Sequence, residues 1–248
     1  MNHSSPRPIV IAHRGLASVA PENTRASFQA ALESKADYVE CDVRLCADDT
    51  IVMMHDPSLD RTTSGEGRLR EKEFNEISGL DAGSWFSKQY ANETIPTFRE
   101  VFRMMKGRKR FVLDVKDADM ASALMHVLEE EGASKDDVVI FSFEWRVIEE
   151  SLKAHPEWDV VFLDDELSED PAVREEELNQ VAKIGCTGIG VSVQRIDQAF
   201  VAMAQGKGLD VYCYTANHPN HIKKLIELGV EAIISDRPDA VVEMAEEN

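Results

Sequence analysis

The chain has 248 residues and a formal net charge of −19, because 46 aspartates and glutamates outnumber 27 lysines and arginines. Hydrophobic residues make up 43% and charged residues 29%, which is typical of a globular protein that buries a substantial core. Nucleic acid needs a net or clustered basic surface, so we expect no nucleic-acid partner. An anionic substrate would require a local pocket of positive charge.

The sequence also carries indications of its compartment. No apolar run approaches the roughly 18 residues of a membrane span, and Met1–Pro8 lacks the layout of a signal peptide. The four cysteines have no metal-ligand spacing and are too few for a disulfide scaffold, which favours buried thiols in a reducing compartment. We therefore expect a cytoplasmic protein without stable membrane association. Its oligomeric state stays open, and a homo-oligomer is compatible with the sequence.

The first third of the chain predicts three strands and a helix. The apolar run Ile9–Ala12 predicts a strand, and Asn23 or Thr24 is suited to cap the helix that follows. Tyr38–Leu45 and Ile51–Met54 are the next strands, separated by a short polar turn. A parallel neighbour would need a crossover of a dozen or more residues, so these two strands should form an antiparallel hairpin.

The periodic pattern is lost between Pro57 and Pro96. This segment includes a short helix candidate around Lys72–Ile77 and is too long for a plain loop in a compact domain. We predict an insertion subdomain at about residues 57–96, between the third strand and the following helix, within a single domain that spans residues 1–248.

Strands and helices alternate again after Pro96. The strand candidates are Phe111–Val115, Val138–Phe141, Val160–Leu163, Gly188–Val191, Val211–Tyr214 and Ala232–Ile234, and the helical stretches between them include Ala121–Glu131, Trp145–Ala154, Glu175–Ile184 and Pro219–Leu228. Repeated β-α units over this length predict a TIM (β/α)8 barrel, in which the hairpin accounts for the ninth strand. A doubly wound open sheet is the alternative, but no Gly-rich phosphate-binding motif follows the first strand.

Residues suited to catalysis lie at the predicted strand ends, where barrel enzymes have their active sites. In the second strand, Glu40 and Asp42 share one face because side chains alternate along a strand. The hairpin would return His55 to about the level of Asp42. One mouth of the barrel would then hold two histidines, three carboxylates, an arginine and a lysine, namely His13, Arg14, Glu40, Asp42, His55, Asp114 and Lys116.

This combination favours a metal and a phosphate diester. Three converging carboxylates repel one another, and a hard divalent cation such as Mg²⁺ or Ca²⁺ resolves the repulsion with oxygen ligands. Arg14 and Lys116 would then make the pocket locally positive, as a phosphate requires. His13 and His55 titrate near neutral pH and would supply a general base and a general acid. Each motif alone fits a surface turn or a solvated strand edge, whereas their coincidence at strand ends favours a site.

An ordered series of motifs extends from Ile9 to Pro238: Ala12-His13-Arg14-Gly15, Pro21-Glu22-Asn23-Thr24, Glu40-Cys41-Asp42-Val43, His55-Asp56-Pro57 with Leu59-Asp60-Arg61-Thr62-Thr63, Asp81-Ala82-Gly83-Ser84-Trp85-Phe86, Ile95-Pro96-Thr97, Ser142-Phe143, Tyr214-Thr215-Ala216-Asn217 and Ile234-Ser235-Asp236-Arg237-Pro238. With these motifs the sequence resembles the glycerophosphodiester phosphodiesterase family. Three places depart from the family's usual pattern. Asp114 stands where the family usually has Glu, and Tyr214 where it usually has Trp. The chain reads Gly190-Val191-Ser192-Val193 where the family often has Gly-x-Asn-Pro.

The resemblance implies hydrolysis of small-molecule glycerophosphodiesters to sn-glycerol 3-phosphate and an alcohol. It also implies a divalent metal held by the three acidic residues, with attack by the substrate's own glycerol hydroxyl through a cyclic phosphate. The implied roles are acid–base catalysis by His13 and His55, phosphate binding by Arg14 and Lys116, a wall of the glycerol or alcohol subsite by Tyr214, and metal binding by Glu40, Asp42 and Asp114.

Two alternatives use the same pocket. A lysophospholipid or phosphatidylglycerol phosphodiesterase would need an exposed apolar lip, for which the insertion offers Leu80, Trp85, Phe86 and Tyr90. A non-catalytic phosphate-binding barrel would be expected to lack an acid–base histidine, and both histidines are present.

Overall fold

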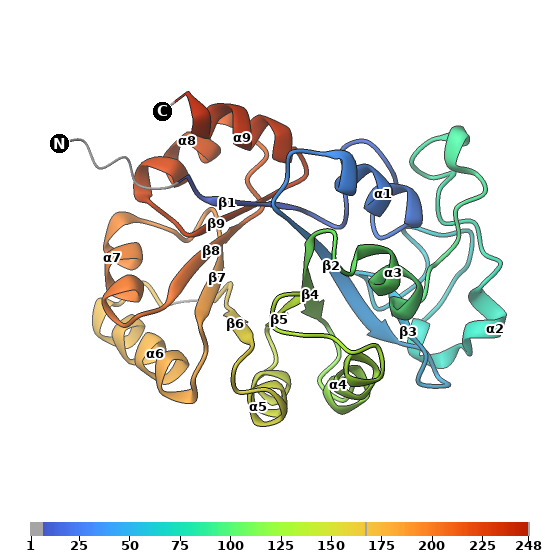
Figure 1. The fold of residues 1–248 in the computed structure, drawn as a ribbon, viewed down its shortest axis with the longest axis horizontal. Coiled ribbons are helices and arrows are strands. Elements are labelled where there is room, and N and C mark those ends of the chain that lie inside the picture. Colours follow the sequence, from blue (N-terminus) through green and yellow to red (C-terminus); the bar gives the residue numbers. More distant parts are fainter. Residues whose placement is uncertain (1–6, 167, 248) are drawn as a thin grey trace.

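Eight parallel strands close into a barrel in the computed structural model, which describes residues 7–166 and 168–247. β1 pairs with both β2 and β9, so the sheet has no free edge between its first and last strands, and helices surround it (Figure 1). This closure confirms the TIM barrel and excludes the open doubly wound sheet. Most of Met1–Pro8, where we expected no signal peptide, lies outside the described residues. The barrel strands are β1 (Ile9–Ala12), β2 (Tyr38–Leu45), β4 (Arg110–Val115), β5 (Val138–Ser142), β6 (Asp159–Leu163), β7 (Gly188–Ser192), β8 (Asp210–Tyr214) and β9 (Ala232–Ser235).

Several helices begin or end at residues with recognisable capping chemistry. Thr24 caps α1, and its side chain accepts a hydrogen bond from the backbone N–H of Ser27. Both α6 and α8 begin with proline and end at a left-handed glycine. The longer helices are α1 (Arg25–Glu33), α3 (Phe98–Met105), α4 (Ala121–Glu130), α5 (Trp145–Ala154), α6 (Pro171–Ile184), α7 (Gln198–Gly206), α8 (Pro219–Leu228) and α9 (Pro238–Glu246). Among the described residues, none of them combines the length and apolarity needed to cross a membrane.

The predicted hairpin is confirmed. β3 (Ile51–Met53) runs antiparallel to the end of β2, with Val43 opposite Met53. Directly after β3, the backbone N–H of Met54 donates to the carbonyl of Asp42 at 3.0 Å. This bond returns the chain to the level of Asp42, and His55 follows it.

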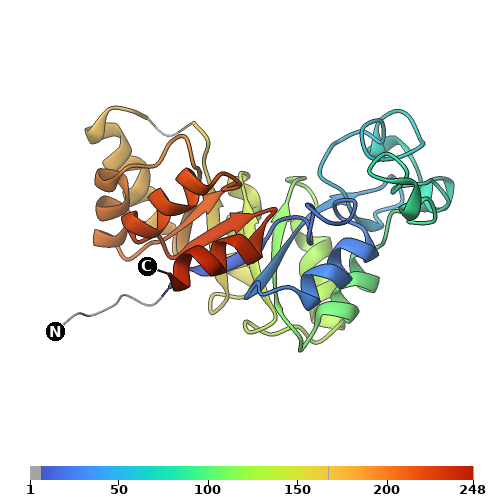
Figure 2. The same ribbon diagram turned by 90° about the horizontal axis from the view of Figure 1, so that it is seen from above.

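Residues 57–96 stand beside one end of the barrel, as Figure 2 shows, and contain only short helices: η1 (Leu69–Glu71), α2 (Phe74–Ile77) and η2 (Lys88–Tyr90). The segment packs with the hairpin around a small apolar cluster of its own, formed by Cys46, Val52, Met54, Leu59, Leu69, Ile77, Ala82 and Ile95. The short helix falls within the range predicted for it. That separate cluster supports our proposal that the segment is an insertion subdomain.

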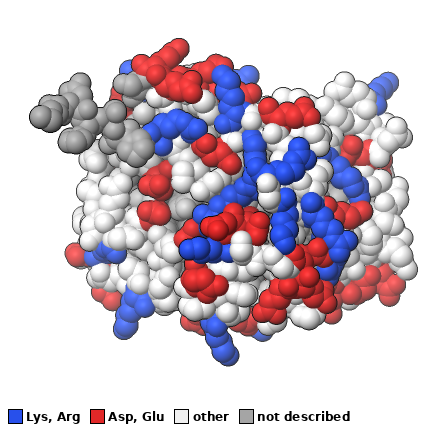
Figure 3. Space-filling view, viewed as in Figure 1, with Lys and Arg blue, Asp and Glu red and all other residues white. Residues whose placement is uncertain are grey.

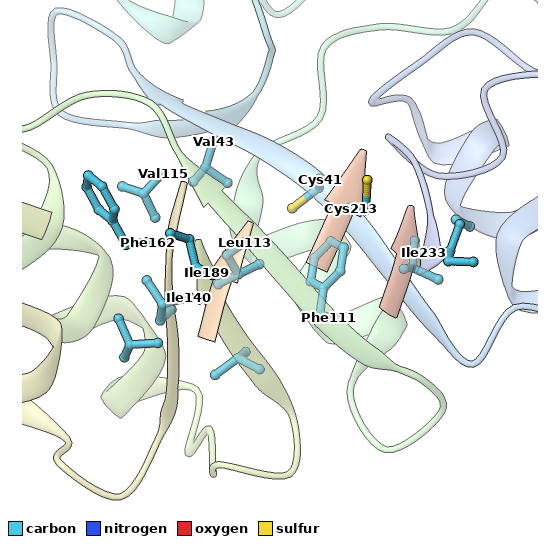
Figure 4. Close-up of a cluster of buried hydrophobic side chains, with 14 of the residues drawn as sticks. Cys41, Val43, Phe111, Leu113, Val115, Ile140, Phe162, Ile189, Cys213 and Ile233 are labelled. Carbon is cyan, nitrogen blue, oxygen red and sulfur yellow. The ribbon is translucent and has the colours of Figure 1, made fainter. Parts of the chain in front are cut away.

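Side chains alternate between two layers of the core. Outward-facing residues such as Cys41, Val43 and Leu113 are fully buried among the helices (Figure 4). Inward-facing residues such as Val112 and Val139 fill the barrel interior. The same alternation turns the acidic residues of β2 and β4 inward, toward the mouth of the barrel.

Candidate active site

Three carboxylates converge where β2 and β4 end. Asp42 and Asp114 are partners in the parallel register, and Glu40 precedes Asp42 on the same face. All three side chains are buried, and one carboxylate oxygen from each lies within 4.8 Å of the others. The structure thus brings together the three predicted metal ligands.

The three carboxylates do not ionise equally easily, because they are buried close to one another. Burial and then the Asp42 charge raise the pKa of Glu40, and burial also raises the pKa of Asp114. Burial opposes ionisation of Asp42 as well, but Lys116 and Arg14 outweigh it and hold the pKa of Asp42 low. A further positive charge would stabilise the fully ionised set.

The donor set fits a divalent cation. Oδ1 of Asp114 is buried without a hydrogen-bond partner, which leaves one oxygen available for a ligand. Glu40 accepts a hydrogen bond from the backbone N–H of Arg14 through Oε2 alone. Asn23 donates to Oδ2 of Asp42 at 2.8 Å and thereby orients that carboxylate. Because the ligands are all oxygens, they suit a hard cation.

Two histidines line the same cavity, and each is held through Nδ1. His13 contacts Oδ1 of Asp236 at 2.6 Å, and His55 contacts Oδ1 of Asp56 at 2.6 Å. Nε2 is therefore the nitrogen that each ring has available for substrate. Burial lowers the pKa of both imidazoles. For His13 the hydrogen bond and charge of Asp236, together with the charge of Glu40, outweigh burial and raise the pKa, whereas the pKa of His55 stays lowered.

Arg14 and Lys116 provide the positive charge. Arg14 has a φ of 52°, and the Gly15 that follows has no room for a side chain, because a Cβ would lie 2.4 Å from Oγ of Ser27. Nη1 of Arg14 donates to Glu22 at 2.7 Å. Nζ of Lys116 lies 3.0 Å from Oδ1 of Asp42 and also contacts Asp114. Basic side chains also gather on the right half of the face in Figure 3, interspersed with acidic ones.

All eight predicted site residues line one cavity of about 150 Å³. Tyr214 lies on the wall opposite the carboxylates, where its hydroxyl donates to Asp165 at 3.0 Å. The rest of that wall is largely apolar and includes Phe141, Phe143, Leu163 and Ile234. The cavity therefore combines a charged half with an apolar half and suits a small polar ligand.

The structure also shows several residues that hold the predicted site residues in place and that the sequence did not lead us to predict. The motifs that carried the resemblance contained them, but we assigned no role to them. The side-chain amide of Asn217 donates to Asp236 and fixes the partner of His13. Asp56, Glu22 and Arg61 form a similar support around His55 and Arg14.

Comparison with known proteins agrees with this geometry. The chain is 31% identical to a glycerophosphodiester phosphodiesterase of Caldanaerobacter subterraneus, over 96% of this chain and 98% of that protein. It is 28% identical to one of Bacillus subtilis, over 95% of this chain and 86% of the other. A solved Oleispira antarctica phosphodiesterase, in complex with the product sn-glycerol 3-phosphate, superimposes with a TM-score of 0.87 at 29% identity and 98% coverage of both chains. The model of the glycerophosphoryl diester phosphodiesterase family matches residues 13–240, and this chain belongs to that family.

Proposed function

We propose that this chain hydrolyses glycerophosphodiesters, such as glycerophosphocholine and glycerophosphoethanolamine, to sn-glycerol 3-phosphate and an alcohol. The observation that carries the proposal is the single cavity that holds two histidines, three carboxylates and two cationic side chains. The names of the full-length relatives and the product bound to the Oleispira antarctica enzyme support the same reaction.

We propose that Glu40, Asp42 and Asp114 hold Mg²⁺ or Ca²⁺. When bound, such a cation polarises a phosphoryl oxygen and offsets the charge that develops during displacement. Arg14 and Lys116 bind phosphate oxygens from the protein side, Arg14 through its planar guanidinium and Lys116 as a point charge. The ring of Tyr214 packs against the glycerol or alcohol part of the substrate.

His13 and His55 move the protons. One imidazole accepts the proton of the substrate's glycerol hydroxyl as its oxygen attacks phosphorus, and the other donates a proton to the leaving alcohol oxygen. Water then opens the resulting cyclic phosphate, with the two imidazoles exchanging roles. Because nucleophile and phosphorus belong to one molecule, the entropic part of the barrier is reduced. The carboxylates on Nδ1 keep both Nε2 atoms directed at the substrate.

The test couples hydrolysis of glycerophosphocholine to detection of sn-glycerol 3-phosphate, with and without EDTA. We expect turnover with Mg²⁺ or Ca²⁺, loss of turnover on chelation, and recovery when the cation is restored. Turnover that ignores EDTA would contradict the metal assignment. Absence of turnover under every metal condition would contradict the proposed reaction.

A lysophospholipid substrate remains a second candidate, because Trp85 of the insertion is exposed. The other residues of the suggested lip, Leu80, Phe86 and Tyr90, are half-buried, and the cavity of about 150 Å³ suits a glycerol phosphate better than an acyl chain. Lysophosphatidylcholine in the same assay distinguishes the two candidates.

We also propose a reducing, cytoplasmic location. The four cysteines are buried free thiols, which supports this proposal.

A further inference from the structure

A chain of ion pairs connects the insertion to the catalytic centre. Arg61, in the insertion, lies between two carboxylates and donates two hydrogen bonds to each. Its Nε and Nη2 reach Asp56 at 2.6 and 2.9 Å, and its Nη1 and Nη2 reach Glu22 at 2.8 Å each. We call these three residues, Asp56, Arg61 and Glu22, the Arg61 bridge.

Each end of the Arg61 bridge holds a residue of the proposed reaction. Asp56 contacts Nδ1 of His55 through the oxygen Oδ1 that also accepts from Arg61. Glu22 accepts from Nη1 of Arg14 through the oxygen Oε1 that also accepts from Arg61. One guanidinium therefore sets the orientation of the carboxylates that hold an acid–base histidine and a phosphate-binding arginine.

The support of the other histidine shows what the bridge does. His13 is held by Asp236, and Asn217, which follows β8 in the barrel, donates to that carboxylate. His55 lies at the rim, after β3. Its carboxylate partner Asp56 accepts hydrogen bonds from Arg61, just as Asp236 accepts one from Asn217. The barrel itself thus fixes His13, whereas His55 depends on a residue of the insertion.

The exposure of the bridge argues against a role in stability alone. The side chain of Arg61 is 44% exposed, and exposed ion pairs contribute little to folding. Glu22 is only 12% exposed, so its charge needs the donors that Arg61 and Arg14 provide. Without Arg61, Glu22 would keep only its contact with Arg14, and Asp56 would be free to turn away from His55.

We propose that Arg61 is a positioning residue for the hydrolysis proposed above, acting on His55 through Asp56 and on Arg14 through Glu22. The inference rests on that proposed function. It predicts that the insertion is required for catalysis because it supplies this one guanidinium. A bidentate fork can bond two carboxylates at once in a way that a lysine ammonium cannot reproduce.

The experiment compares Arg61→Gln and Arg61→Lys with Arg68→Gln in the glycerophosphocholine assay. Arg68 is the matched control, because it is an exposed arginine of the same insertion whose side chain has no ion pair among the described residues. We expect Arg61→Gln to lower kcat about 10- to 100-fold, as loss of a residue that orients a catalytic group does. It should also raise KM, since Glu22, which holds Arg14, loses the two hydrogen bonds from Arg61 that orient it. Arg61→Lys should recover part of kcat, and Arg68→Gln should behave as wild type.

Thermal unfolding separates positioning from stability. An exposed ion pair adds little to folding, so Tm of Arg61→Gln should fall by no more than about 4 °C. Equal kcat values for Arg61→Gln and wild type, or for Arg61→Gln and Arg61→Lys, would overturn the inference. So would an equal loss in Arg68→Gln. Absence of hydrolysis by the wild-type chain would instead contradict the proposed function, so the two failures are distinguishable.

Discussion

Asp42 and Asp114 are register partners on adjacent parallel strands, and Nζ of Lys116 contacts both carboxylates. The two carboxylates thus share the ammonium group of Lys116, yet Oδ1 of Asp114 still has no hydrogen-bond partner. Lys116 therefore compensates the acidic cluster only in part. The remaining oxygen is the one that we assign to a divalent cation.

Asp114→Asn tests this assignment. The amide keeps the size of the side chain but removes its charge, so we expect the affinity for Mg²⁺ or Ca²⁺ to fall by at least about tenfold. Calorimetric titration of the metal-free protein with each cation measures this. Asp136→Asn, at an exposed position, is the control and should bind as wild type. Unchanged affinity and stoichiometry in Asp114→Asn would remove Asp114 from the ligand set.

His13→Ala and His55→Ala should each lower kcat about 10²- to 10⁴-fold, the contribution typical of a positioned acid or base. Arg14 and Lys116 are retained in both variants, so KM should change less than kcat. The coupled assay at saturating and at low glycerophosphocholine separates the two constants. His126→Ala, on the exposed face of α4, should leave both unchanged. A wild-type kcat in either active-site variant would show that the imidazole transfers no proton.

Asp236→Asn should lower kcat about 10- to 100-fold, because the amide cannot hold His13 through the same charged contact. Removal of the carboxylate also takes away a contact that raises the pKa of His13. The pH profile of kcat/KM should therefore shift toward lower pH for the step that depends on protonated His13. An unshifted profile together with a normal kcat would show that Asp236 does not act through the imidazole.

The sequence predicted the barrel and which residues meet in its cavity, because both follow from simple rules about strands. Period-2 alternation puts Glu40 and Asp42 on one face, and the short connection to β3 requires an antiparallel hairpin. Since parallel strands of a barrel end at one mouth, residues at those ends must meet there. These rules do not depend on how irregular segments fold.

The supporting contacts could not be predicted in this way. Asp236 is 223 residues from His13 in the chain, and only closure of the barrel between β1 and β9 brings them together. Arg61 reaches Glu22 because the insertion, which has no periodic pattern, folds back over the rim. Arg61 belongs to one of the motifs that carry the family resemblance, but no local sequence pattern indicated which carboxylates its side chain would contact.

Asp37 provides a pH-dependent contribution to stability outside the active site. It accepts two hydrogen bonds from Arg7, at 2.6 and 2.8 Å, and one from the backbone N–H of Val10 at 2.8 Å. Burial opposes ionisation of Asp37, but these bonds outweigh it and hold the pKa of the carboxyl below its ordinary value. Because the folded pKa is lowered, the stabilisation is fully present above the unfolded pKa and is lost as pH falls through the folded one.

Asp37→Asn should therefore lower the free energy of unfolding by about 1 kcal/mol at pH 7, a value reduced for the partial exposure of the pair. The difference from wild type should shrink as the pH falls from about 5 toward 2, because the wild-type carboxylate then becomes protonated. Urea unfolding at a series of pH values measures both free energies, with Asp136→Asn as the exposed control. A difference that stays constant across this range would show that the Asp37 charge does not stabilise the fold, and that the loss at neutral pH comes from the changed hydrogen-bond geometry alone.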